Sequence, residues 1–169
     1  MTAAPADLLI DRPATADGAA LWRLAKDSKT LDLNSSYSYL LWCRDFAGTS
    51  AVVRDERGEP VGFVTGYIPP DRPGTLLVWQ VAVDAAQRGR GLAARLLDGL
   101  TERVAAEHEG LTAIETTITP GNTASERLFT SYAERHGATV ERTVLFEAGD
   151  FPDGPHDPEV LYRIGPLSV

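Results

Sequence analysis

The segment of this chain that best fits a known ligand chemistry is a glycine-rich turn that follows an apolar run. The run covers residues 78–84, and Arg88, Gly89 and Gly91 come after a short polar link. Glycines let the backbone approach a ligand closely, and the free N–H groups of a first helical turn face an anion. A strand, a glycine turn and a helix in this order therefore indicate a pyrophosphate site. An ordinary strand–helix turn is the alternative, because two glycines alone are a weak signal.

The spacing within this turn does not fit two common nucleotide-binding motifs. A dinucleotide-binding turn needs G-x-G-x-x-G and an acidic residue about 20 residues later. Here residues 92–94 (Leu-Ala-Ala) follow Gly91 and do not complete that pattern, and no Gly-Lys-Ser/Thr ending is present. The pattern Arg88-x-x-Gly91-x-Ala93 instead resembles the acetyl-coenzyme A (acetyl-CoA) motif of the GCN5-related N-acetyltransferases, the GNAT family.

This resemblance implies acetyl-CoA as cosubstrate and assigns cofactor-binding residues. In the family a splayed strand offers backbone N–H groups to the pantetheine and thioester, and the glycine turn binds the pyrophosphate. Those roles map onto Val81, Ala82, Val83, Arg88, Gly89, Arg90, Gly91, Leu92 and Ala93. The family's last-helix pattern, Asn-x-x-Ala/Ser-x-x-Leu-Tyr, is matched by Asn122, Ser125 and Leu128, which adds Asn122 and Ser125 as cofactor candidates. Asn122 also reads as a helix cap.

The elements that must position these residues alternate along the chain. Apolar periodicity and turn residues predict strands at 8–12, 50–54, 61–68, 78–84, 113–119, 139–146 and 160–164, and helices near 17–25, 37–42, 91–108 and 122–137. The order β-α-α-β-β-β-α-β-α-β-β predicts an α/β (α+β) fold with a twisted mixed sheet and helices on both faces. It is also the order of the GNAT fold, and we expect one domain over residues 1–169.

Composition limits the partners and the location. The net charge of −8 disfavours nucleic acid or an anionic membrane as the main partner and tolerates a cationic small molecule. No apolar run approaches the roughly 20 residues of a membrane span. Residues 1–8 lack the pattern of a secretory signal. Cys43 is the single cysteine, so no intramolecular disulfide forms, which fits a cytoplasmic protein.

Five separated blocks carry a narrower resemblance. Residues 31–41, 62–70, 78–84, 115–120 and 159–166 resemble the L-2,4-diaminobutyrate acetyltransferases of ectoine biosynthesis. This resemblance implies transfer of acetyl from acetyl-CoA to the γ-amino group of L-2,4-diaminobutyrate, by direct attack in a ternary complex. It also implies a cytoplasmic homodimer. His108, His136 and His156 are scattered along the chain, so we expect no metal site.

The reaction requires a group that removes a proton from the amine. An aliphatic ammonium with a pKa of about 10.4 is almost fully protonated at neutral pH and attacks only once neutral. Glu115, on a predicted strand beside the splayed one, is the candidate base, directly or through one water. It could instead pair with the ammonium or be a solvated strand residue. Thr117 lies two residues on and points the same way.

Other residues near these strands are candidates for the substrate pocket. Asp32, with Asn34 and Ser35, could bind the α-ammonium group or shape the pocket wall, although Asn34 and Ser35 are also good N-caps for the helix at 37. Tyr37 could offer a hydroxyl or pack. Trp79 shares strand parity with Val81 and Val83, so it could line the pocket or belong to the core. Arg44, His156 and Arg163 are candidates to bind the substrate carboxylate, although each also reads as a surface or interface residue.

The sequence departs from the superfamily at the residue that often protonates the leaving thiolate. Phe129 occupies the position of the usual tyrosine, so no phenol acts from there. Tyr132, one turn later, could substitute or could simply pack, and solvent could protonate the thiolate instead. Two other functions stay open: a GNAT acetyltransferase for another small amine or amino acid, and a non-catalytic CoA-binding domain.

Overall fold

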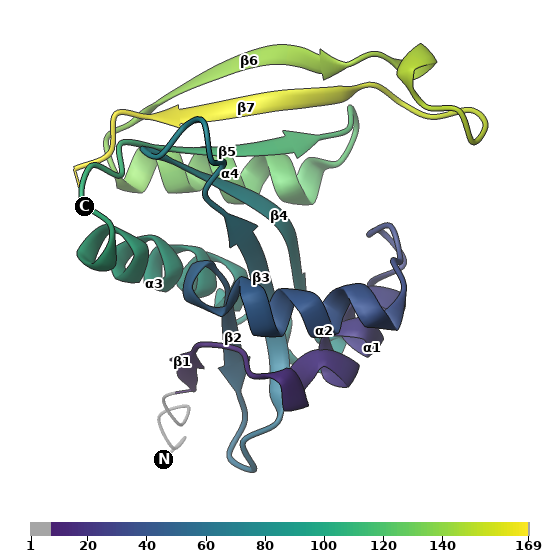
Figure 1. Cartoon of the computed structure of the whole chain (residues 1–169), viewed down its shortest axis with the longest axis vertical. Helices are drawn as coiled ribbons and strands as arrows, with labels where there is room; N and C mark the ends of the chain where they lie inside the picture. Colours follow the sequence, from purple (N-terminus) through teal and green to yellow (C-terminus); the bar gives the residue numbers. More distant parts are fainter. Residues whose placement is uncertain (1–7, 169) are drawn as a thin grey trace.

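A computed structural model describes residues 8–168, which build a seven-stranded sheet with helices on both faces (Figure 1). The first half contains β1 (Leu9–Asp11), α1 (Gly18–Ser28), α2 (Ser36–Asp45), β2 (Ala51–Arg54), β3 (Pro60–Tyr67) and β4 (Thr75–Val83). The second half contains α3 (Leu92–Glu107), β5 (Ala113–Ile118), α4 (Thr123–Arg135), β6 (Thr139–Phe146) and β7 (Glu159–Gly165). The predicted fold class and each predicted helix and strand are confirmed.

The strand order differs from the chain order at one end of the sheet. The order is β1-β2-β3-β4-β5-β7-β6, so β7 inserts between β5 and β6. β4 and β5 are parallel, because α3 carries the chain across the sheet, while the other neighbouring strands run antiparallel. The insertion places the β6–β7 connection beside the carboxyl end of β5.

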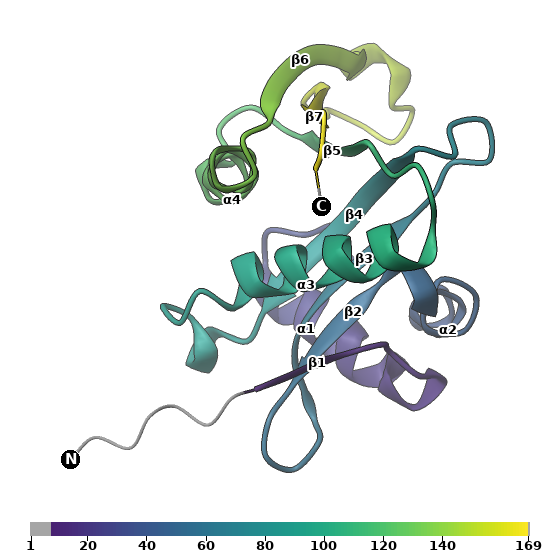
Figure 2. The same ribbon diagram turned by 90° about the vertical axis from the view of Figure 1, so that its left-hand side faces the viewer.

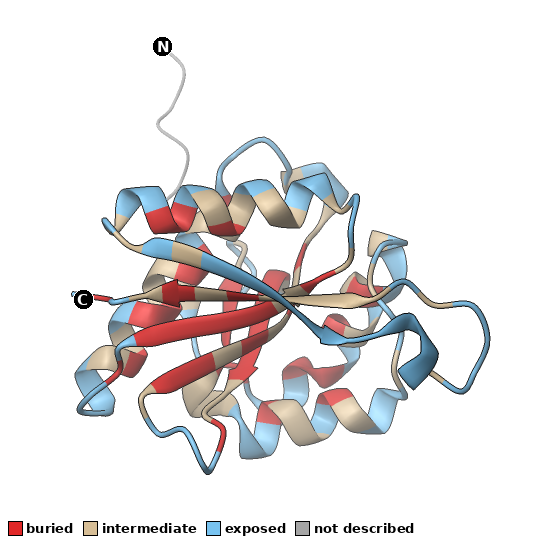
Figure 3. Ribbon diagram, turned by 90° about the horizontal axis from the view of Figure 1, so that it is seen from above, coloured by how far each residue is buried: buried red, intermediate tan, exposed pale blue. Residues whose placement is uncertain are grey.

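Two apolar clusters fix the helices on opposite faces of the sheet (Figure 2). On one face, α3 contributes Leu96, Leu97 and Leu100, and α4 contributes Phe129, to the larger cluster. On the other face, residues of α1 and α2 pack against β2, β3 and β4. Helices α1 and α2 cover only the first half of their face, and β6 is exposed along almost its whole length (Figure 3).

The parallel strands β4 and β5 pair over a short distance and then stop pairing. Their register runs from Thr75 opposite Ala113 to Val78 opposite Thr116. β4 continues to Val83 and β5 to Ile118 without further pairs between them. The carboxyl ends of the two strands therefore leave an opening in the sheet, where ligands of α/β proteins commonly bind.

A β-bulge at this opening corrects the predicted orientation of Trp79. Thr65 pairs with Gln80 but Gly66 pairs with Val78, so Trp79 is an extra residue in β4. Trp79 and Gln80 both contact Tyr39 on the α2 side of the sheet. The prediction that Trp79 shares the parity of Val81 was wrong, because Val81 packs against the α3 cluster instead.

A buried ion pair ties the start of the chain to the sheet. Asp17 is 7% exposed, and both of its carboxylate oxygens accept hydrogen bonds of 2.8 Å from Arg54 on β2. Burial raises the pKa of Asp17, but the hydrogen bonds from Arg54 and the Ala14 N–H outweigh it, so the pKa is lowered. A lowered folded-state pKa means that the carboxylate stabilises the fold above its unfolded pKa of about 3.9 and loses this contribution as the pH falls.

We therefore expect Asp17→Asn to lower the free energy of unfolding by about 3 kcal/mol at pH 7, because it leaves the buried Arg54 charge with only the exposed Asp11, at 3.4 Å, as an acidic partner. Urea unfolding from pH 7 to pH 3 is the measurement. The difference between wild type and variant should shrink as the pH falls below about 4, because protons then bind Asp17 of the unfolded wild type before they bind the ion-paired carboxylate of the fold. A difference that does not change with pH would show that the ion pair is not its source.

Candidate active site

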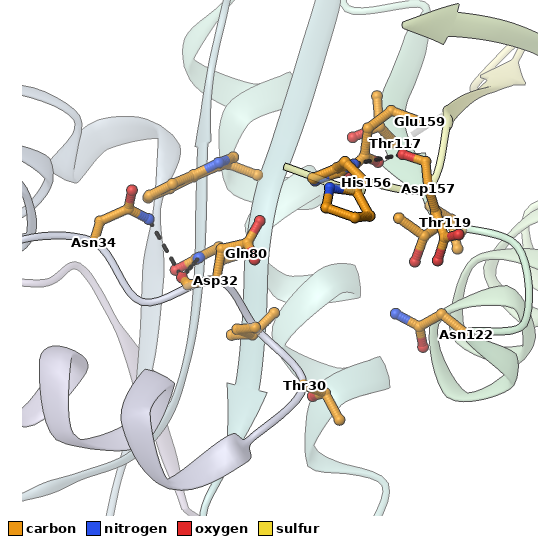
Figure 4. Close-up of a pocket in the computed structure, with 14 residues that line it drawn as sticks. Thr30, Asp32, Asn34, Gln80, Thr117, Thr119, Asn122, His156, Asp157 and Glu159 are labelled. Atoms are coloured by element: carbon orange, nitrogen blue, oxygen red, sulfur yellow. Dashed lines mark hydrogen bonds between the residues drawn. The ribbon is translucent and has the colours of Figure 1, made fainter. Parts of the chain in front are cut away.

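A cavity of about 450 Å³ lies at the opening between β4 and β5 (Figure 4). Its walls come from the α1–α2 connection, the β4 bulge, the end of β5 and the residues after it, and the β6–β7 connection. They comprise Thr30, Leu31, Asp32, Asn34, Trp79, Gln80, Thr117, Ile118, Thr119, Asn122, Pro155, His156, Asp157 and Glu159. Trp79 and Thr117 follow directly after the last paired residues of the two strands, so the cavity begins where the sheet opens.

The cavity is acidic. Asp32 lies on one side, and Asp157 and Glu159 lie on the other (Figure 4). Among the described residues no lysine or arginine lines it. Carboxylates facing one small cavity without basic partners favour a cationic ligand.

Gln80 fixes the wall that carries Asp32. Its buried amide oxygen accepts a hydrogen bond of 2.9 Å from the Tyr39 hydroxyl, and its amide nitrogen donates one of 2.9 Å to the backbone carbonyl of Asp32. The bulge in β4 makes this possible, because it turns Gln80 toward α2. Gln80 was not among the residues predicted from the sequence, since a buried strand glutamine looks like any other until its partners are known.

Trp79 is held in the cavity wall by aromatic side chains of α2. Its ring stacks on Trp42 with centroids 4.8 Å apart and planes 11° from parallel, and it also contacts Tyr39. The structure thus gives Trp79 both predicted roles, as a wall of the cavity and as a packed aromatic residue.

The β6–β7 connection supplies part of the cavity wall, of which only His156 was predicted, as a candidate to bind the substrate carboxylate. The ring of His156 stacks on Phe151 with centroids 3.7 Å apart, which orients it at the cavity. Asp157 and Glu159 complete this wall. Glu159 is the first residue of the block 159–166 that resembles the diaminobutyrate acetyltransferases, so this resemblance could have pointed to it. Asp157 lies among Pro and Asp residues that indicate only a loop.

Glu115 lies outside the cavity lining. It is 5% exposed, and its Oε1 accepts a hydrogen bond of 2.8 Å from Arg163, its neighbour in register on β7. The same oxygen is 3.7 Å from Nε of Arg72. A carboxylate enclosed by two guanidinium groups neutralises them, and this geometry does not favour Glu115 as the base. Glu115 also pairs with Arg163, which was one of the residues predicted to bind the substrate carboxylate.

The other predicted substrate residues divide into two groups. Asp32, Asn34 and Thr117 line the cavity. Ser35 is the N-cap of α2 and accepts from the Ser38 N–H, so its capping role is the one that the structure supports. Tyr37 is 66% exposed and lies outside the cavity lining.

A second cavity of about 400 Å³, here termed the cofactor groove, lies between the glycine turn and α4. Gly89 and Gly91 have φ angles of +82° and +69°, a backbone conformation that favours glycine. Gly91 is the N-cap of α3, so the N–H groups of the first turn lack helical partners and are available to an anion. The predicted residues Val83, Arg88, Gly89, Gly91, Leu92 and Ala93 line the groove.

The remaining predicted cofactor residues lie outside the groove lining. Val81 and Ala82 lie in β4 beyond its last pair with β5. Arg90 contacts Gln87 instead, and the N–H of Ser125 donates to Asn122, which caps α4. Asn122 lines the first cavity, next to the residues at the end of β5, and not the cofactor groove.

The structure supports packing as the role of Tyr132. It is fully buried, and its hydroxyl donates a hydrogen bond of 3.0 Å to Thr101 on α3. Burial is the main reason that the pKa of Tyr132 is raised, although the Thr101 contact lowers it. Within residues 8–168, no cluster of three or more His, Cys, Asp or Glu side chains is arranged to hold a metal. No helix in that range is long and apolar enough to cross a membrane.

A family model described as the acetyltransferase (GNAT) family matches residues 19–133, and the chain belongs to this family. Similar chains share the fold at low identity. The protein yncA from Salmonella typhimurium, solved with its cofactor acetyl-CoA, is 18% identical with a TM-score of 0.72, covering 97% of this chain and 96% of that one.

Nearer relatives define the branch of the family. L-2,4-diaminobutyric acid acetyltransferases from Streptomyces avermitilis and Streptomyces coelicolor are 79% and 74% identical, covering 97% and 100% of this chain and 91% and 99% of theirs. The chain belongs to the L-2,4-diaminobutyric acid acetyltransferases. The solved diaminobutyrate acetyltransferase EctA from Paenibacillus lautus, in complex with its substrate and coenzyme A, is 42% identical with a TM-score of 0.88 and 95% coverage of both chains.

Proposed function

We propose that this protein transfers the acetyl group of acetyl-CoA to the γ-amino group of L-2,4-diaminobutyrate, giving the N-acetylated intermediate of ectoine biosynthesis. The observation that carries this proposal is an acidic cavity that begins where β4 and β5 diverge. The relative from Paenibacillus lautus, which binds diaminobutyrate and coenzyme A, shares this fold over 95% of the chain. The enzyme is an acetyl-CoA-dependent N-acetyltransferase.

The charges of the cavity suit the substrate. Diaminobutyrate carries two ammonium groups and one carboxylate at neutral pH. We assign Asp32 to one ammonium group and the wall formed by Asp157 and Glu159 to the other. The amide of Asn34 and the hydroxyl of Thr117 are neutral donors available to the carboxylate. Opposed acidic walls would hold the two ammonium groups apart and so orient the substrate.

We assign Glu159 as the group that receives the proton of the reacting amine, directly or through one water. It is half-buried at the start of β7, next to the end of β5, and it engages no arginine among the described residues. The neutral amine then attacks the thioester carbonyl and forms a C–N bond. Backbone N–H groups of β4 after the bulge stabilise the oxyanion. The C–S bond breaks, and the nitrogen gives up its second proton, through water, to the departing thiolate.

We also propose that the protein is a cytoplasmic homodimer. Val144, Leu145 and Phe146 at the end of β6 are exposed, and no helix among the described residues covers their part of the sheet (Figure 3). Exposed apolar side chains in one place favour a protein interface, and a second copy is the occupant that we propose. Sedimentation equilibrium gives the assembly mass, and a monomer at micromolar concentration would contradict the proposal.

The release of free thiol from acetyl-CoA tests the proposed function. We expect the highest kcat/KM with L-2,4-diaminobutyrate, compared with ornithine, lysine and 2,3-diaminopropionate. A difference of one methylene is worth about 10–200-fold, so ornithine should be a weaker substrate. A clear preference for another amine would favour a different GNAT activity. Tight binding of acetyl-CoA with no turnover of any amine would favour a non-catalytic domain.

A further inference from the structure

The cofactor groove contains a basic wall that the glycine turn does not account for. One side of the groove is a single stripe of α4: Ala124, Arg127, Leu128, Ser131 and Arg135. Residues spaced three or four apart share one face of a helix, so these side chains line the groove together. This wall belongs to α4 and is separate from the N-terminus of α3.

The charge of the groove is opposite to that of the chain. The chain has a net charge of −8, but no Asp or Glu among the described residues lines the groove. Its charged lining residues are Arg88, Arg127 and Arg135. Arg135 pairs with Asp98, so Arg88 and Arg127 carry the positive charge of the groove, and two positive charges favour a ligand with more than one negative charge.

Two of these three arginines are already accounted for by a neighbouring residue. Arg135 donates to both carboxylate oxygens of Asp98, at 2.9 and 3.3 Å, so its charge is offset. Arg88 adjoins Gly89 in the turn that the family resemblance assigns to the pyrophosphate, and it lines the groove. The Arg127 side chain forms no hydrogen bond or ion pair with any residue between 8 and 168.

We propose that Arg127 binds a second anionic group of the cofactor, the 3′-phosphate on the ribose of acetyl-CoA, and that Ser131 adds a hydroxyl donor one turn later. A planar guanidinium matches the geometry of a phosphate monoester. The proposal rests on acetyl-CoA as the acetyl donor. It makes Arg127 a specificity-determining residue that distinguishes coenzyme A from dephospho-coenzyme A, which lacks this phosphate.

Calorimetric titration of the full chain with coenzyme A and with dephospho-coenzyme A tests the proposal without the amine substrate. We expect the wild type to bind coenzyme A about tenfold or more tightly than the dephospho form, as one charge-assisted hydrogen bond to phosphate allows. Arg127→Met should weaken coenzyme A binding by that factor and leave dephospho-coenzyme A unchanged. Arg57→Met, which removes an exposed arginine from the β2–β3 turn, is the control and should retain the preference.

Three results would overturn the proposal. They are a wild type that does not distinguish the two ligands, an Arg127→Met variant that retains the preference, and a variant that loses affinity for both ligands equally. Arg127→Lys, which keeps the charge, should retain part of the preference and guards against a folding defect. Normal turnover of diaminobutyrate together with any of these results would leave the proposed function intact, whereas absence of coenzyme A binding in the wild type would remove both.

Discussion

Glu159→Gln is expected to lower kcat with diaminobutyrate by about 10²–10⁴-fold, because glutamine keeps the shape of the side chain but cannot accept the amine proton. Affinity for coenzyme A should not change, since Glu159 lies in the cavity wall and outside the cofactor groove. Steady-state thiol release and calorimetry separate the two effects.

Glu115→Gln is the matched comparison for this variant. It makes the same chemical change on β5, where the carboxylate pairs with Arg163. We expect a loss of stability with a smaller loss of kcat, because the change leaves Arg163 without its buried partner. Full activity of Glu159→Gln together with a collapse of kcat in a folded Glu115→Gln variant would return the base role to Glu115.

Gly91→Asp is expected to weaken coenzyme A binding by about 100-fold or more. Gly91 has a φ of +69° and precedes the first turn of α3. An aspartate there puts a negative charge and a side chain where the pyrophosphate approaches. Losing two charge-assisted hydrogen bonds of roughly 1.5 kcal/mol each corresponds to that factor. Calorimetric titration with coenzyme A measures it.

Gly58→Asp controls for the backbone cost of this change. Gly58 has a φ of +82° in the β2–β3 turn and lies outside the groove, so the variant has the same left-handed strain and the same added charge. It should bind coenzyme A like the wild type. Equal losses in the two variants, or none in either, would refute the placement of the pyrophosphate at the Gly91 turn.

Features that depend on neighbouring residues in the chain were predictable from the sequence. Apolar periodicity located each helix and strand, and the glycines after residues 78–84 located the turn that lines the cofactor groove. Asp32, Asn34 and Thr117 were also predicted and do line the first cavity. These residues lie at the ends of elements, where polar side chains stand out against apolar runs.

Features that depend on pairing between strands were not predictable. The extra residue at Trp79 is visible only in the register of β3 and β4, and it reverses the parity that a regular strand would have. The insertion of β7 between β5 and β6 brings Asp157 and Glu159 to the cavity. In the chain these two residues lie about 40 positions after the end of β5. The pairing of Glu115 with Arg163 results from the same insertion.

The position of the acetyl group on the product tests the central claim most directly. Wild-type protein with acetyl-CoA and L-2,4-diaminobutyrate should give a single product, which NMR identifies as acetylated on the γ-nitrogen. A single product is expected because the two ammonium groups meet different walls of the cavity. Acetylation of the α-nitrogen, or a mixture of both products, would contradict the orientation of the substrate by Asp32 and Glu159.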